Sequence, residues 1–153
     1  MKRLKPLGCQ NLPALESAGA VWLEEPFQAS AYEAYGELAK RSGKVRLAGG
    51  EGAHNVHMAR HLMEYGGVGF IQIDAGRVGG ITSALRVYQH AQASGVAFVN
   101  HTFTSHLQLS ASLQPYAGLR EHEICEYPVE LKAVAMAITA AYRLYLGGAA
   151  DWT

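Results

Sequence analysis

Five short apolar segments recur along the chain, and each one ends in or runs into an ionisable residue. They are AVWLEE, VRLAGGE, GFIQIDAG, VAFVNH and EICEYP, at residues 20–25, 45–51, 69–76, 96–101 and 123–128. Continuous apolar runs of this length are typical of strands that are covered on both faces, as in a parallel sheet. This pattern limits the fold more than any other feature of the sequence.

Helical patterns lie between the apolar segments. Two of them open with a capping box, in which a serine precedes Glu or Gln by three residues: Ser30 with Glu33, and Ser105 with Gln108. Strands that alternate with helices predict an α/β fold with right-handed crossovers. A doubly wound sheet and a (β/α) barrel both fit this order. No G-x-G-x-x-G motif follows a strand, so the dinucleotide-binding version lacks its signature.

The composition excludes several classes of function. The 13 Lys and Arg residues balance the 13 Asp and Glu residues, so nothing favours binding to nucleic acid or an anionic membrane. No apolar run approaches the roughly 18 residues of a transmembrane helix, and the first residues lack the apolar core of a secretion signal. Cys9 and Cys125 are too few and too far apart for a disulfide framework or a zinc knuckle. We expect a cytoplasmic protein with reduced thiols.

The residues at the strand ends are the candidates for chemistry. Glu24, Glu51, Asp74, His101 and Glu126 follow one another at intervals of 23 to 27 residues, which is nearly the length of one βα unit. In a barrel, the carboxyl ends of adjacent strands meet at one rim, where barrel enzymes carry their active sites. We therefore expect these five side chains to converge on one cavity.

Converging carboxylates repel one another, and a divalent cation removes the conflict. Oxygen-only ligands favour Mg²⁺, so Glu24 and Glu51 are the candidate metal ligands. Asp74 and His101 form a candidate catalytic dyad, in which the carboxylate orients the imidazole and raises its basicity. Glu126 is a candidate donor of a hydrogen bond or proton to developing negative charge.

Four motifs in this order carry a family resemblance: WLEEP, AGGEG, IDAGRVGGIT and VNHTFTSH. Together they resemble the catalytic barrel domain of the enolase superfamily, in the branch of mandelate racemase and muconate lactonising enzyme. The likeness covers residues 20–130, while 1–19 and 140–153 are atypical. It implies a single domain over 1–153, a partial TIM-type (β/α) barrel of about five consecutive βα units.

The resemblance also implies a reaction and its participants. In that family a base removes the proton α to a carboxylate, and Mg²⁺ stabilises the enediolate. Motif by motif, this implies Glu24 and Glu51 as metal ligands, Asp74 with His101 as the dyad, and Glu126 at the last strand. The substrate would be a small carboxylate, either a sugar acid or a 2-hydroxy acid. An acid-sugar dehydratase is favoured over a racemase.

Several family features are missing from the sequence. They are the third metal carboxylate, the Lys-x-Lys strand, the capping domain and three strand positions. We therefore expect a homo-oligomer or a missing N-terminal portion to cover the open edges of the sheet. The alternative is a catalytically inactive barrel fragment that only folds and oligomerises.

Further polar residues of the sequence have more than one interpretation. Arg77 either meets a substrate carboxylate or braces a loop, and Asn100 is a candidate substrate ligand. His57 and His61 stand four residues apart, as zinc ligands on a helix do, but the H-E-x-x-H motif is absent. We interpret this pair as part of a solvated helix face. No His-x-His occurs on an early strand, as a zinc-dependent barrel hydrolase would require.

Overall fold

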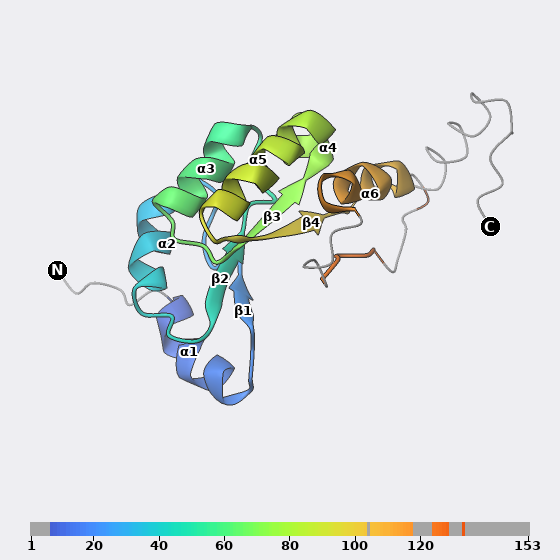
Figure 1. The fold of residues 1–153 in the computed structure, drawn as a ribbon. Helices are drawn as coiled ribbons and strands as arrows, with labels where there is room; N and C mark the ends of the chain where they lie inside the picture. Colours follow the sequence, from blue (N-terminus) through green and yellow to red (C-terminus); the bar gives the residue numbers. More distant parts are fainter. Residues whose placement is uncertain (1–6, 104, 118–123, 129–132, 134–153) are drawn as a thin grey trace, which may run out of the picture.

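The computed structural model describes residues 7–103, 105–117, 124–128 and 133 (Figure 1). The strands of the described chain are β1 (Trp22–Glu24), β2 (Arg46–Gly49), β3 (Phe70–Asp74) and β4 (Ala97–His101). The helices are α1 (Leu7–Ser17), α2 (Tyr32–Ala39), α3 (Val56–Glu64), α4 (Ala75–Val78), α5 (Ile81–Ala93), α6 (His106–Leu113) and the 3-10 turn η1 (Gln114–Tyr116). Within these residues, no helix combines the length and the apolar character needed to cross a lipid bilayer.

The four strands form one parallel sheet in the order β1-β2-β3-β4. Each strand pairs with the next one along the chain, so the sheet has no point at which the strand order reverses. A doubly wound sheet has such a reversal and a barrel does not. The predicted α/β class and partial barrel are therefore confirmed.

Helices cover one face of this sheet. In Figure 1, α2, α3 and α5 lie side by side on that face, and the main core fills the space beneath them. The core takes Leu47 from β2, Ile71 and Ile73 from β3 and Phe98 from β4. Successive strand residues point to opposite faces, so the residues between these four point to the face that no helix of the described chain covers.

That second face corresponds to the inside of the barrel. Its apolar cluster consists of Ala48, Phe70 and Val99, with Trp22 and Ala97 packed against them. The Trp22 and Phe70 rings lie 4.8 Å apart between their centroids. All five residues of β3 are buried, as predicted for a strand that is covered on both faces.

The predicted strand over 123–128 is wrong for the residues that the structure describes, because 124–128 contain no strand. The segment is instead attached to β4 through a side chain. The Asn100 amide donates to the carbonyl of Glu126 and accepts from its N–H, both at 2.9 Å. A side-chain amide therefore takes the place of a main-chain ladder here, and the described sheet has four strands instead of five.

The two predicted capping boxes differ in outcome. Ser105 is the N-cap of α6 and accepts a hydrogen bond from the N–H of Gln108 at 3.2 Å, as predicted. The box at Ser30 is wrong, because Ala31 is the N-cap of α2 and no side chain caps that helix. The Ala31 N–H donates to the carbonyl of Gln28, which closes a turn around Ser30. This turn moves the helix start one residue beyond the serine.

Candidate active site

Asp74 and His101 are the last residues of β3 and β4, and they are paired in the sheet register. Their side chains therefore point to the same face, at the carboxyl end of the sheet. His101 Nδ1 lies 3.0 Å from Asp74 Oδ2. Both residues are buried, with 1% of Asp74 and 4% of His101 exposed. The parallel pairing of two adjacent strands thus builds the predicted carboxylate–imidazole pair.

Asp74 is held by two further hydrogen bonds. Its Oδ1 accepts a hydrogen bond from the main-chain N–H of Arg77 at 3.0 Å, and this bond caps α4. The side chain of Gln108 also forms a hydrogen bond with the carboxylate. Burial alone would raise the pKa of Asp74, but the hydrogen bonds from His101, Arg77 and Gln108 outweigh it and lower that pKa. The carboxylate is therefore ionised and can orient the ring of His101.

The second ring nitrogen of His101 also faces carboxylates. Its Nε2 lies 3.0 Å from Glu51 Oε2 and 3.9 Å from Glu126 Oε1. Burial lowers the pKa of His101, whereas the hydrogen bond to Asp74 and the charges of Glu126 and Glu51 raise it, and the net shift is upward. Two ring nitrogens can both donate to carboxylates only as imidazolium, so this arrangement favours the charged ring.

Arg77 joins the loops that follow β2 and β3. Its Nη1 lies 3.0 Å from Glu51 Oε1 and 3.2 Å from the Glu51 carbonyl, and its Nε lies 3.8 Å from Asp74 Oδ2. The sequence left two interpretations of Arg77, and these contacts agree with the one in which it braces a loop. Binding of a substrate carboxylate by Arg77 stays a prediction.

Two acidic residues end β1, and they are placed differently. Glu24 is exposed and accepts from Trp22 Nε1 at 3.2 Å. Glu25 has a φ of 39°, which is uncommon for a residue with a side chain. Its Oε1 is buried and has no hydrogen-bond partner. Burial and the charge of Glu51 raise the pKa of Glu25, against a hydrogen bond from the main chain of Gly50.

Glu126 and Asn100 lie at the other side of the site. The carboxyl group of Glu126 is partly buried near His101, and its pKa is raised by burial and by the charges of Glu24 and Glu51, against the opposing effect of His101. Asn100 is fully buried and precedes His101 on β4, so it points to the opposite face of the strand. There it bonds the main chain of Glu126 and Thr102 Oγ1. Its substrate-binding role stays a prediction.

The residues at this rim suit magnesium in their chemistry. Magnesium prefers oxygen ligands, and Glu24, Glu25 and Glu51 supply carboxylates whose repulsion a cation would relieve. Glu25 Oε1 adds a buried oxygen that has no hydrogen-bond partner. Among the described residues, however, no group of three or more His, Cys, Asp or Glu side chains is arranged to hold a metal ion. To bind the ion, Glu51 would exchange its contacts with Arg77 and His101.

The histidine pair on α3 is placed as a surface feature. His57 and His61 are both exposed. The ring of His61 packs between two tyrosines, with centroids 5.9 Å from Tyr32 and 5.4 Å from Tyr65. These contacts agree with a solvated helix face rather than a zinc site.

Sequence reasoning missed the contribution of α6 to this site. Ser112 Oγ and the Gln108 side chain reach the main chain of His101 and the carboxylate of Asp74. The capping box at Ser105 predicted where the helix starts, but no local pattern indicates which side chains of a helix meet a strand end. The positive φ of Glu25 was also missed, because no residue type in WLEEP indicates it.

The family can now be assigned. The model of the enolase C-terminal domain-like family matches residues 8–144, which is most of the chain. This chain belongs to that family. Asp74, His101, Glu51 and Glu126 all lie within the matched range. The partial barrel described above is thus part of an enolase C-terminal domain-like fold.

Known members of the enolase superfamily resemble different shares of this chain. The D-galactonate dehydratase of Variovorax paradoxus is 34% identical over 109 residues, which are 71% of this chain and 28% of that protein. A predicted mandelate racemase from Rhodobacter sphaeroides, solved by crystallography, is 60% identical with a TM-score of 0.79, over 83% of this chain and 32% of that one. A mandelate racemase/muconate lactonizing protein from Paracoccus denitrificans is 31% identical, with a TM-score of 0.68. The chain thus spans about a third or less of the first two relatives.

Proposed function

We propose that this chain carries a magnesium-dependent site that removes the proton α to a carboxylate, in an acid-sugar dehydratase. The observation that carries the proposal is the buried pair in which Asp74 holds Nδ1 of His101 and leaves Nε2 directed at the acidic rim. The similarity to D-galactonate dehydratases supports a sugar acid as substrate. A racemase would share the first step.

His101 is the proposed base. Loss of the Nε2 proton to solvent, as Glu51 leaves that nitrogen, would give the neutral ring. Its Nε2 would then take the α-proton, and Asp74 would stabilise the imidazolium that forms. In the dehydration step the bond between the β-carbon and its hydroxyl breaks, and the leaving hydroxide takes the proton from His101 to form water. The ring of His101 returns to the neutral state in which it takes the α-proton. Glu126, with its raised pKa, can donate a hydrogen bond to the charge that develops on the substrate.

Glu24 and Glu51 are the proposed ligands of the magnesium ion. When bound, the ion would neutralise negative charge on the substrate carboxylate. Without this neutralisation, the C–H next to the carboxylate is a very weak acid. Through its hydrogen bond to the Glu51 carbonyl, Arg77 would keep the loop of Glu51 next to that of Asp74 while the Glu51 carboxylate changes partners. Small carboxylates are the expected ligands of this rim.

The test is proton exchange at the α-carbon. The chain is incubated with D-galactonate and Mg²⁺ in deuterated water, and NMR and mass spectrometry follow α-deuterium and the loss of water. We expect exchange in the wild type, its loss in His101→Asn and after chelation, and no change in His57→Asn, a matched control on the exposed face of α3. Exchange that survives in His101→Asn would remove His101 from the base role. Exchange with inversion and no loss of water would favour the racemase.

A second candidate is a folded domain without turnover. The observation in its favour is that both oxygens of Glu51 already contact cationic partners, Arg77 and His101. It predicts that millimolar Mg²⁺ leaves the thermal unfolding midpoint unchanged and that no exchange occurs. The dehydratase proposal predicts that Mg²⁺ raises this midpoint, because the ion binds the folded state only.

A further inference from the structure

A single hydroxyl of α6 joins the ends of the two strands that carry the dyad. Ser112 Oγ accepts the N–H of Ala75 at 3.3 Å and donates to the carbonyl of His101 at 3.2 Å. Ala75 follows Asp74 directly, so the bridge runs between the main chains of the two dyad residues. Ser112 and Ala75 are each 1% exposed.

The bridge lies where the sheet itself stops. The last pair in the register is Asp74 with His101, and α4 begins at Ala75 and turns the chain away from β4. A buried N–H and a buried C=O would be left without partners at this point, which is costly. The hydroxyl satisfies both groups and so extends the link between β3 and β4 by one step.

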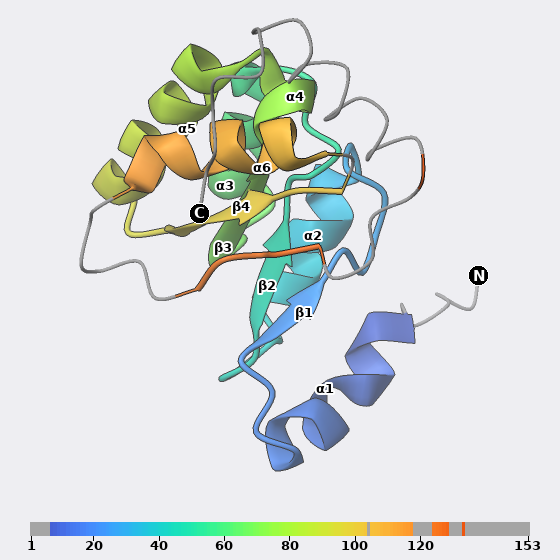
Figure 2. The same ribbon diagram turned by 90° about the vertical axis from the view of Figure 1, so that its right-hand side faces the viewer.

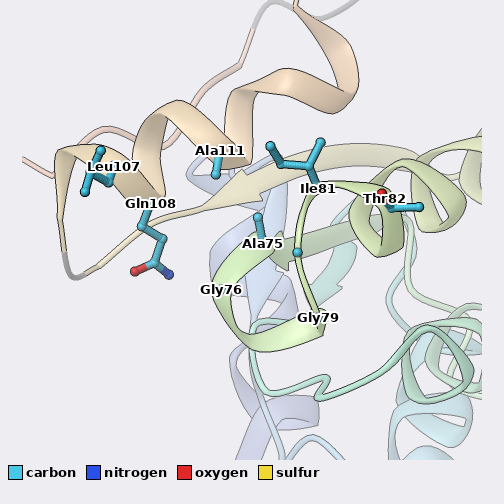
Figure 3. A pocket seen from close by; sticks show the side chains of 9 residues that line it. Ala75, Gly76, Gly79, Ile81, Thr82, Leu107, Gln108 and Ala111 are labelled. Atoms are coloured by element: carbon cyan, nitrogen blue, oxygen red, sulfur yellow. The ribbon is translucent and has the colours of Figure 1, made fainter. Parts of the chain in front are cut away.

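Gln108, one turn before Ser112 on the same helix, makes the second contact. It bonds the carboxylate of Asp74 and lines a pocket of about 500 Å³ between α4, α5 and α6. Figure 3 shows its side chain projecting from α6 toward Gly76 in α4. Residues four apart lie on one helix face, so Ser112 and Gln108 reach the dyad from the same side.

We propose that α6 is a positioning element that fixes the geometry of the Asp74–His101 pair through Ser112 and Gln108. Ser112 would set the spacing of the two main chains, and Gln108 would set the orientation of the carboxylate. The proposal rests on the proposed function only where turnover is the readout. In that case both residues would act through the dyad without touching the substrate.

The first readout is the proton on Nδ1 of His101, observed by NMR without substrate. In the wild type we expect a downfield resonance that exchanges slowly with water, because the proton is buried between His101 and Asp74. In Ser112→Ala we expect this resonance to broaden or disappear, and in Ser112→Thr, which keeps the hydroxyl, we expect it to be retained. Ser110→Ala, the same change on the exposed side of α6, serves as the matched control.

The second readout is turnover in the exchange assay. A misplaced catalytic group costs about 10²-fold in rate at a displacement of 1 Å, so we expect at least a tenfold loss of kcat in Ser112→Ala with little change in KM. Leu109→Ala, which shortens a buried apolar side chain of the same helix, should lower the unfolding midpoint and leave the resonance unchanged. This control separates positioning from general stability.

The outcomes are distinct. A folded Ser112→Ala that keeps the wild-type resonance would overturn the proposal. Should that variant fail to fold, Gln108→Leu, a change at a half-buried side chain, gives the decision, with a broadened resonance expected and an unchanged one overturning the role of α6. A third outcome is that the variants show the expected changes in the resonance but the wild type shows no exchange of the substrate α-proton. This would reject the proposed function and leave the positioning role in place.

Discussion

Asp74 uses its two oxygens for two different purposes. Oδ1 caps the helix that follows, and Oδ2 holds the imidazole of the neighbouring strand. The same carboxylate therefore stabilises the turn into α4 and orients His101. A substitution at this position should affect folding as well as turnover.

The pH dependence of stability follows from the lowered pKa of Asp74. Because the folded-state pKa lies below the unfolded value of about 3.9, the stabilisation is complete above that value and is lost as the pH falls through the folded-state pKa. We expect the wild type to exceed Asp74→Asn in free energy of unfolding at pH 6, and the difference to shrink below about pH 4. Urea unfolding between pH 3 and pH 6 measures this, and a difference that grows on acidification would contradict it.

At the scale of residues, the sequence was informative where chemistry follows an apolar run. Glu51, Asp74 and His101 each stand where a strand ends, and the structure brings them within contact distance. Ser112 and Gln108 lie inside α6, and the apolar pattern of that helix does not predict what its polar side chains contact. Ala75 lies 37 residues from Ser112, and even the nearer partner, His101, lies 11 residues from it on another element, so only the folded chain brings these groups together.

At the scale of elements, the sequence predicted the four strands of the sheet and failed at the fifth. The run EICEYP has the composition of a strand, but the amide of Asn100 binds the main chain of Glu126 in place of a neighbouring strand. Whether an apolar run becomes a strand depends on the partner available to it. No property of the run itself encodes that partner.

The end of β2 makes the next prediction. Gly50 has a φ of +125°, and a Cβ there would lie 2.7 Å from Ile71 Cδ1 and 2.9 Å from the Gln72 carbonyl oxygen. We expect Gly50→Ala to cost about 1–2 kcal/mol for backbone strain and about 1–3 kcal/mol for overpacking, measured by urea unfolding. Gly95, with a φ of +68° and open space around it, is the matched control and should show only the strain. Equal losses in the two variants would argue against the clash.

At the scale of the whole molecule, the sheet of the described residues has two edges, and no helix among those residues covers one of its faces. Figure 2 shows β1 at one edge of the sheet, with α1 beside its amino end. Val21, next to β1, is 59% exposed, and Trp22 belongs to the apolar cluster of the inner face. Exposed strand edges and apolar patches favour association.

We therefore expect the chain to self-associate. Light scattering should show a mass that rises with concentration in the micromolar range, and Val21→Lys should reduce the association because a charged edge opposes pairing. Glu33→Gln, on the exposed side of α2, shifts the net charge by the same one unit and so controls for the change in net charge. A monodisperse monomer at every concentration would reject this prediction.

The shared register of Asp74 and His101 has a consequence for how this domain can change. Successive residues of a strand point to opposite faces. Both side chains therefore stay on the inner face only if the number of residues in β3 and β4 changes by an even number or not at all. Inserting or deleting one residue within Ala97–His101 would turn the imidazole toward the helices and bring Asn100 to the rim. Length variation is therefore confined to the connections outside the strands, or to steps of two within them.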